Sequence, residues 1–202
     1  MNRTKDLVKF FLFGVIGMAL SLGVFNCQPA WAEDEEHEND AGALFTALPQ
    51  SKLSLSDGVR QATKGTEVPI SAKFELDDNG KLSLSVYTAE KGLAVDAQKN
   101  VLKELAGSPE SQTWNPQTEV FKDEEHLERA GNQLAIMAKS KFSLLDIIEK
   151  VQKENQGTVF AATPEEEGNN PVIEIKIAKA GKVTEQHFDI ASGNEMKMDD
   201  NY

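Results

Sequence analysis

Cysteine is almost absent from this sequence, since its 202 residues contain only Cys27. That residue lies in the amino-terminal segment 1–32, which has the features of a cleavable signal. The mature chain is therefore expected to contain no cysteine. An exported protein without disulfides must fold on its hydrophobic core alone.

The sequence also lacks recognisable catalytic machinery. It has no G-x-S-x-G and no phosphate-binding loop. The pattern H-E-x-x-H, which His37 and Glu38 begin, would need a second histidine where Ala41 stands. The remaining histidines, His126 and His187, are far from His37 and from each other and share no ligand spacing. We therefore expect no enzyme: no catalytic residue, no cofactor-binding residue and no metal ligand is assigned.

Basic residues are scarce relative to acidic ones, 21 against 33, and the net charge is −12. Without residues 1–32 the balance is 18 basic against 32 acidic residues, a charge of −14. Nucleic acid and membrane lipid are not expected partners of the mature chain, because binding to either depends on clustered Lys and Arg. Proteins, cations and basic peptides remain, although acidity also serves simply to keep a protein soluble.

Segment 1–32 is predicted to be a secretory signal peptide. Arg3, Lys5 and Lys9 form a basic start, residues 10–25 form an uncharged run of 16, and residues 30–32 form an A-x-A cleavage site before an acidic stretch. The run is shorter than the roughly 18 to 20 apolar residues of a spanning helix, which favours cleavage over a retained anchor. Lipidation of Cys27 is disfavoured because a bulky Phe and a polar Asn precede it. The predicted location is periplasmic or secreted.

The segment after the signal, residues 33–50, is predicted to be an acidic, disordered leader. Its first ten residues are too charged and too poor in apolar groups to pack against a core. The rest of the mature chain is long enough for one ordinary domain or two small ones. No later segment is apolar enough to cross a membrane.

Two heptapeptides 89 positions apart are nearly identical: SKLSLSD at 51–57 and SKFSLLD at 140–146. In each, a serine stands three residues before an aspartate and ahead of an apolar run, which is the pattern of a helix capping box. The repetition indicates a tandem duplication, and its residues have structural roles. Gly58 is expected to weaken the first helix by about 1 kcal/mol relative to alanine, so the second helix should be the better one.

After each predicted helix the hydrophobic period changes from 3.6 to 2. Residues 68–76 alternate apolar with polar residues or proline, a turn follows at 78–80, and the alternation resumes at 82–86. This pattern predicts a β-hairpin. A third strand is expected at 93–96 in the first copy and, four residues longer, at 182–189 in the second.

The predicted fold class is therefore α+β. It consists of two tandem α-β-β-β units, residues 51–107 and 140–202, each a three-stranded antiparallel sheet covered by one helix. A unit of this size is marginally stable by itself.

The segment 108–139 is predicted to be a linker followed by a helix. The polar, proline-containing stretch 108–116 is typical of a linker, and apolar residues spaced 3, 4, 3 predict a helix over 123–139. The stripe consists of Leu127, Ala130, Leu134 and Met137. It could bind a partner helix, but such a stripe more often covers the chain's own core, in which case this helix packs the two units together.

Each unit ends in a short motif that carries a family resemblance. The second copy has Asp-x-x-Ser-Gly at 189–193, and the first has Asp-Ala-Gln-Lys-Asn at 96–100, where Asn100 replaces glycine. Asparagine tolerates the left-handed conformation that glycine would supply. With the preceding helix, hairpin and third strand, the chain resembles tandem PepSY domains over about 51–105 and 140–198.

The resemblance implies a non-catalytic module of exported or membrane-anchored proteins, with inhibition or regulation of proteases as the suggested role. It brings no catalytic residues. The predicted function is accordingly recognition of a protein or peptide partner in the cell envelope, through an exposed sheet edge or the groove between the repeats. The oligomeric state is not predicted.

Two other functional classes stay open. One is a metal-handling or redox accessory protein. His187 precedes a tail with Met196 and Met198, and imidazole with thioethers suits Cu(I). The other is a purely structural component of an envelope complex.

Overall fold

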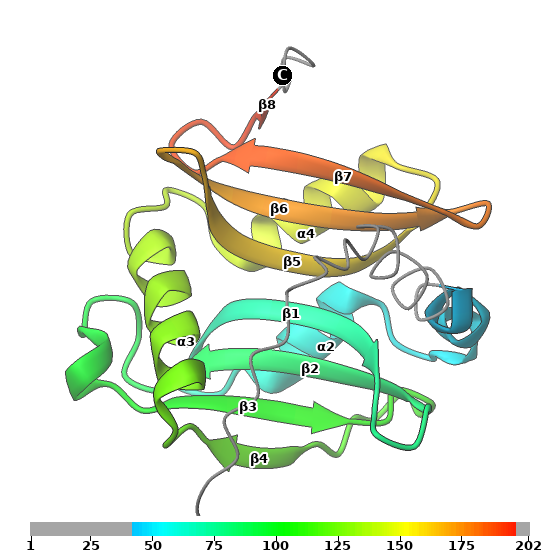
Figure 1. Ribbon diagram of the computed structural model, residues 1–202, viewed down its shortest axis with the longest axis horizontal. Coiled ribbons are helices and arrows are strands. Elements are labelled where there is room, and N and C mark those ends of the chain that lie inside the picture. Colours follow the sequence, from blue (N-terminus) through cyan, green and yellow to red (C-terminus); the bar gives the residue numbers. More distant parts are fainter. Residues whose placement is uncertain (1–41, 197–202) are drawn as a thin grey trace, which may run out of the picture.

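The computed structural model describes residues 42–196 (Figure 1). The predicted signal peptide, the leader as far as residue 41, and Met198 lie outside this range. Residues 42–50 are helical rather than disordered, ending in the 3-10 helix η1 (Leu48–Gln50). The reason is core contact: Ala47 and Leu48 are buried, and Phe45 packs edge-on against Phe160 with ring centroids 6.4 Å apart. No helix within 42–196 is long and apolar enough to span a membrane.

The fold is α+β, and its strands form one antiparallel sheet that has eight strands within the described range. Their order across the sheet is β4-β3-β2-β1-β5-β6-β7-β8 (Figure 1). The strands are β1 (Val68–Leu76), β2 (Leu82–Ala89), β3 (Leu102–Gly107), β4 (Gln117–Val120), β5 (Thr158–Glu167), β6 (Asn170–Lys179), β7 (Lys182–Asp189) and β8 (Glu195–Met196).

The expectation of two separate three-stranded sheets is therefore corrected. Each half gains a short outer strand, β4 or β8, and the halves join where β1 pairs with β5 through Ala72↔Ala162 and Lys73↔Ala161. Alone, each half would leave the backbone groups of its first strand unpaired at an edge, and the join pairs some of these groups.

The join has the symmetry of the duplication. Ala72 and Ala161 are equivalent in the 89-residue repeat, as are Lys73 and Ala162, so the repeat operation exchanges the two backbone pairs. An approximate two-fold axis therefore passes between β1 and β5. The ion pair between Arg60 and Glu149, 2.6 Å, spans the same 89 positions.

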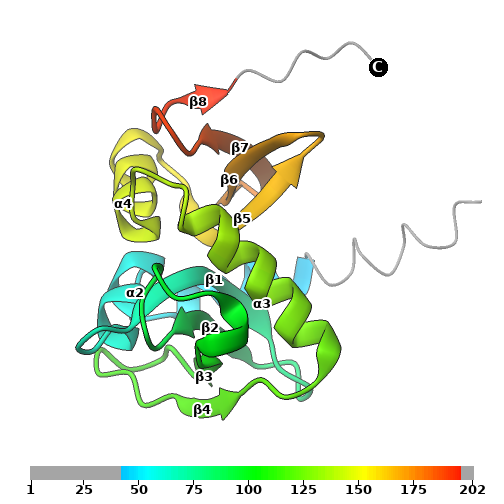
Figure 2. The same ribbon diagram turned by 90° about the vertical axis from the view of Figure 1, so that its left-hand side faces the viewer.

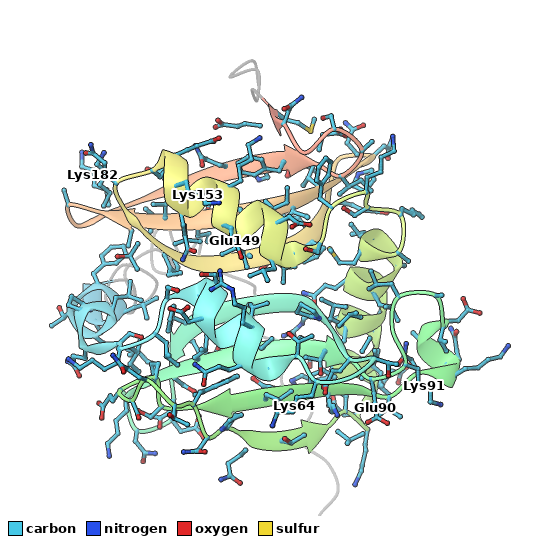
Figure 3. The ribbon with its side chains drawn as sticks, turned by 180° about the vertical axis from the view of Figure 1, so that it is seen from behind. Lys64, Glu90, Lys91, Glu149, Lys153 and Lys182 are labelled. Carbon is cyan, nitrogen blue, oxygen red and sulfur yellow. The ribbon has the colours of Figure 1, made fainter. Side chains whose placement is uncertain are left out.

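Helices cover both faces of the sheet. α2 (Leu55–Ala62) and α4 (Leu144–Glu154) lie side by side on one face, with Glu149 on the side of α4 nearest α2 (Figure 3). α3 (Glu124–Met137) crosses the other face and contacts both halves through β1, β3 and β5 (Figure 2). The helix predicted for the linker is thus confirmed, and it covers the chain's own core. Ala130, Leu134 and Met137 of the predicted stripe are buried, whereas its first residue, Leu127, is 38% exposed.

The capping boxes are also confirmed. In α2 the Ser54 hydroxyl accepts from the Asp57 N–H at 3.2 Å, and the Asp57 carboxylate accepts from the Ser54 N–H at 3.1 Å. Ser143 and Asp146 make the same two bonds at the start of α4, at 3.1 and 2.9 Å. The repeated heptapeptide is therefore a repeated helix start.

The third strand of the first copy was predicted in the wrong place. β3 lies at 102–107 rather than 93–96. Leu84 of β2 lies opposite Gly107 of β3, whereas Ile173 of β6, which is 89 positions after Leu84, lies opposite Phe188 of β7. The strand thus arrives eight residues later than the 89-residue spacing predicts. Residues 93–101 form a loop with the 3-10 helix η2 (Ala97–Lys99), so the longer connection belongs to the first copy.

The two predicted terminal motifs differ in structure. Asn100 has φ −85° rather than the expected left-handed conformation, and its side-chain amide donates to the carbonyls of Gly92 and Val95 at 2.9 and 3.0 Å. In the second copy, Asp189 accepts from the Ser192 N–H at 2.7 Å. Gly193 has φ 65° there, and Lys150 of α4 donates to its carbonyl at 2.7 Å. This motif ties the end of β7 to α4.

The linker is less free than its composition suggested. Trp114 is buried, its backbone N–H donates to the Gln61 side chain at 2.8 Å, and its indole N–H donates to the Gly107 carbonyl at 3.3 Å. The strand β4 then follows, which was not predicted. All four of its residues are exposed, so no alternation of buried and exposed positions marks it.

Gly58 in α2 is required by packing, which corrects the expectation that it merely weakens the helix. A Cβ at this position would overlap Leu84 of β2, whose side chain is fully buried. We predict that G58A lowers the free energy of unfolding by about 1 to 3 kcal/mol, because overpacking outweighs the gain in helix propensity. Urea denaturation measures this change. G42A is the control, since nothing lies within 4 Å of its added methyl group, and equal stability of G58A and wild type would contradict the account.

The first capping box also predicts a pH dependence. The pKa of Asp57 is lowered, chiefly because the Ser54 hydroxyl donates to its carboxylate at 2.6 Å. A lowered pKa stabilises the fold above the unfolded value of 3.8, and that contribution is lost as the pH falls below it. S54A should therefore cost about 1 kcal/mol near neutral pH and less in acid. Urea denaturation of the wild type and S54A, at neutral pH and at a pH below 3.8, measures this difference. An equal loss of unfolding free energy at both pH values would contradict the prediction.

Candidate functional site

A groove of about 440 Å³ lies between α3 and β5. We call it the junction groove, because it adjoins the place where the two halves meet. From α3 it is lined by Arg129, Asn132, Gln133, Ala135 and Ile136, with Lys139 just beyond, and from β5 by residues 163–166. The groove has a counterpart in the other half: a cavity of about 500 Å³ is lined by Ala47, Gln50 and Asp77, which lie 89 positions before Ile136, Lys139 and Glu166.

A smaller polar cavity of about 120 Å³ lies beneath α3 and shares Arg129, Gln133 and Thr163 with the groove. Its other lining residues come from β1 and β2: Ser71, Lys73, Ser85 and Tyr87. Burial raises the pKa of the Tyr87 phenol, so this hydroxyl stays protonated and can donate a hydrogen bond. The cavity is the polar inner end of the groove.

Gln133 links the two spaces. Its residue is 6% exposed, and the buried end of its side-chain amide, assigned as Oε1, has no hydrogen-bond partner among the described residues. A buried polar atom without a partner costs about 1 to 3 kcal/mol. The other buried residues of α3 are apolar and stabilise the fold, whereas the unpaired amide of Gln133 does not.

The groove exists because the two halves pair over a short distance. Within the described chain the β1–β5 register contains only the two pairs centred on Ala72 and Ala162. At the next position the Ser71 hydroxyl reaches the Ala162 carbonyl at 3.5 Å, and both Ser71 and Thr163 line the polar cavity. The backbones of β1 and β5 separate there, beneath α3.

Charge is divided between the walls of the junction groove. The α3 side carries Arg129, which pairs with Glu125 at 2.7 Å, and Lys139. The β5 side carries Glu165 and Glu166. Opposite charges on facing walls suit a ligand with both donors and acceptors, such as a polypeptide segment.

One acidic wall residue also belongs to a cluster of ionisable side chains. The side chains of Glu165 on β5, Glu174 on β6 and His187 on β7 converge, and one potential ligand atom from each lies within 4.8 Å of the others. His187 Nε2 is 3.5 Å from Glu165 Oε1 and 3.9 Å from Glu174 Oε2. Burial, and then the charge of Glu174, raise the pKa of Glu165.

The structure therefore gives His187 neighbours that the sequence analysis did not predict. Met196 of β8 pairs with His187 across the sheet, while Met198 lies outside the described residues. His126 is elsewhere, at the start of α3, where it lies 2.7 Å from Asp123 and stacks on Phe121. The signal that could have revealed the cluster is Glu174, a charged residue that interrupts the apolar strand β6.

The sheet edges are the other surface that the sequence analysis considered. β4 at one edge has four residues, and β8 at the other has two. Residues 182–186 of β7 pair with β6 on one side and have no strand on their outer side in the described part of the chain. Val120 and Val183 on these edges are 43% and 41% exposed. Both edges are short or charged, as is usual for edges that resist unwanted pairing.

No protein-family model matches the chain, and no curated protein matches it in sequence. Among solved structures it is similar to a protein from Clostridium difficile 630 described as a "putative lipoprotein". The identity is 17%, the match covers 65% of this chain and 81% of the other, and the TM-score is 0.34. A similarity this distant supports no conclusion about fold or function.

The unpaired amide predicts an unusual effect of mutation. We expect Q133L to raise the free energy of unfolding by about 1 kcal/mol or more, because it replaces a buried polar atom without a partner by an apolar group of similar size. N132L changes the adjacent, exposed position and should leave stability nearly unchanged. Chemical denaturation of both variants measures the difference. A clear loss of stability in Q133L would show that the amide is satisfied within the fold.

Proposed function

We propose that this chain is a non-catalytic, exported binding or regulatory module whose junction groove holds an extended segment of a protein partner in the cell envelope. Proteases are among the candidate partners. The observation that carries the proposal is Gln133, which lines the groove and whose buried amide end has no hydrogen-bond partner among the described residues. When this end turns into the groove, a bound segment would supply the missing hydrogen bond, and the stability lost in the free protein would be recovered on binding.

A polypeptide suits this groove better than a small apolar ligand does. The walls offer hydroxyl, amide and charged groups of both signs, which match the alternating donors and acceptors of an extended backbone. The separated strands β1 and β5 add main-chain groups beside Ser71 and Thr163. Pairing of an extended segment with such groups is a common mode of peptide recognition.

The acidic charge of the chain favours a basic partner. A net charge of −14 without the signal segment would speed encounters with positively charged proteins and slow encounters with acidic ones. Arg129 and Lys139 on the α3 wall would then bind carbonyl groups or acidic side chains of the segment and so fix its orientation.

We also propose that the two halves are diverged PepSY-like repeats of an exported protein. Support comes from the order helix, hairpin, third strand in both halves, from the matched capping boxes, and from the motif at 189–193. Export is supported by the signal features of residues 1–32. The regulatory role follows from the resemblance alone.

Site-specific photo-cross-linking tests the proposed groove. A photo-reactive amino acid replaces Ala135 in the groove or, as matched controls, Val120 or Val183 on the sheet edges, all of them exposed. The mature chain is then incubated with envelope extract, and cross-linked proteins are identified by mass spectrometry. We expect a defined partner to cross-link from position 135 and not from the edges.

Q133L supplies the second arm of this experiment. It should abolish the cross-link from position 135 while leaving the chain folded and more stable, whereas Q117L, the same change at an exposed glutamine of β4 outside the groove, should leave the cross-link unchanged. Cross-linking from the edge positions alone, or an undiminished cross-link in Q133L, would contradict the groove as the binding site.

A further inference from the structure

We propose that Glu165, Glu174 and His187 form a binding site for a divalent transition-metal ion, with Zn²⁺ the best match. The three residues come from adjacent strands β5, β6 and β7, and Glu174 and His187 are direct cross-strand partners. Side chains on the central part of a sheet are held more precisely than side chains on loops. The site goes beyond the proposed protein binding, because it is defined by its ligands and tested with metal alone.

The distances favour a shared ion over direct hydrogen bonds. His187 Nε2 lies 3.5 Å from Glu165 Oε1 and 3.9 Å from Glu174 Oε2, both longer than the roughly 3.2 Å limit for a good N–H···O bond. Around a tetrahedral Zn²⁺ with bonds of about 2.0 to 2.1 Å, neighbouring ligand atoms lie about 3.4 Å apart. The two histidine–carboxylate distances are close to that value, and the ligand atoms of the two carboxylates lie within 4.8 Å of each other.

The three side chains have unused bonding capacity. Among the described residues, their only polar side-chain contact with another group is that of Glu174 Oε1 with the Lys176 ammonium at 3.4 Å, although Glu174 is only 8% exposed. The two carboxylate oxygens of Glu174 have different neighbours: Oε1 lies 3.4 Å from the Lys176 ammonium, and Oε2 lies 3.9 Å from His187 Nε2. Lys176 also pairs with Glu185 at 2.8 Å. The lysine therefore offsets part of the local negative charge and leaves one Glu174 oxygen free for a metal ion.

The donor set indicates the class of ion. One imidazole and two carboxylates suit Zn²⁺ and similar borderline ions, whereas Cu(I) prefers sulfur ligands. Three protein ligands leave a fourth tetrahedral position for water or another ligand. Glu165 also lines the junction groove, so an ion at this site would lie beside the place proposed for the protein partner.

Metal titration of the mature chain tests the proposal. After treatment with a chelator, Zn²⁺ alone is titrated in a calorimeter, and Co²⁺ is titrated as a spectroscopic probe of tetrahedral coordination. We expect one ion of this class to bind. H187Q and E165Q should each weaken binding by at least about tenfold, since loss of outer-shell partners alone costs 10- to 100-fold. Circular dichroism establishes that both variants are folded.

Matched histidine variants identify the site. H126Q removes an exposed histidine that contacts Asp123 on α3, and H37Q removes a histidine outside the described residues, and both should bind Zn²⁺ as the wild type does. Failure of the wild type to bind Zn²⁺ would overturn the proposal. Binding in H187Q that equals the wild type, or binding lost in H37Q instead, would overturn it as well. None of these outcomes depends on a protein partner.

Discussion

The pairing of Ala72 with Ala162 and of Lys73 with Ala161 joins the two halves of the molecule into one sheet. Each half alone is small enough to be marginally stable, and the join lets the halves share a single hydrophobic core. α2 and α4 close one face of the join and α3 closes the other. The 89-residue offset exchanges the two pairs of the join, which places the strands of both halves in one wide sheet.

The same join creates the candidate site. Within the described chain β1 and β5 pair at two positions only, and beside them Ser71 and Thr163 line the polar cavity beneath α3. The repeated residues therefore explain folding, whereas α3 brings to the groove Gln133 and Arg129, which stand where Leu44 and Asp40 lie 89 positions earlier. The carboxylate–histidine cluster lies at the β5 side of this groove, so both proposals concern neighbouring surfaces.

Local features could be predicted from the sequence, and non-local ones could not. The capping serines, the hairpins and α3 depend on residues a few positions apart, and the structure has them. The pairing of β1 with β5, the late position of β3 and the role of Gly58 depend on residues far apart in the chain, such as Gly58 and Leu84. Glu165, Glu174 and His187 are likewise brought together only by strand register, and no spacing in the sequence marks them as a group.

Hydrogen–deuterium exchange of the mature chain, measured with and without its captured partner, tests most directly the claim that binding occurs at the junction. The account predicts that binding slows exchange in two segments: residues 129–139, which comprise most of α3 and the two residues after it, and residues 163–166 of β5. Exchange in β4 and in residues 182–186 of β7 should not change. Slower exchange confined to residues 117–120 or 182–186, with the groove unaffected, would contradict it.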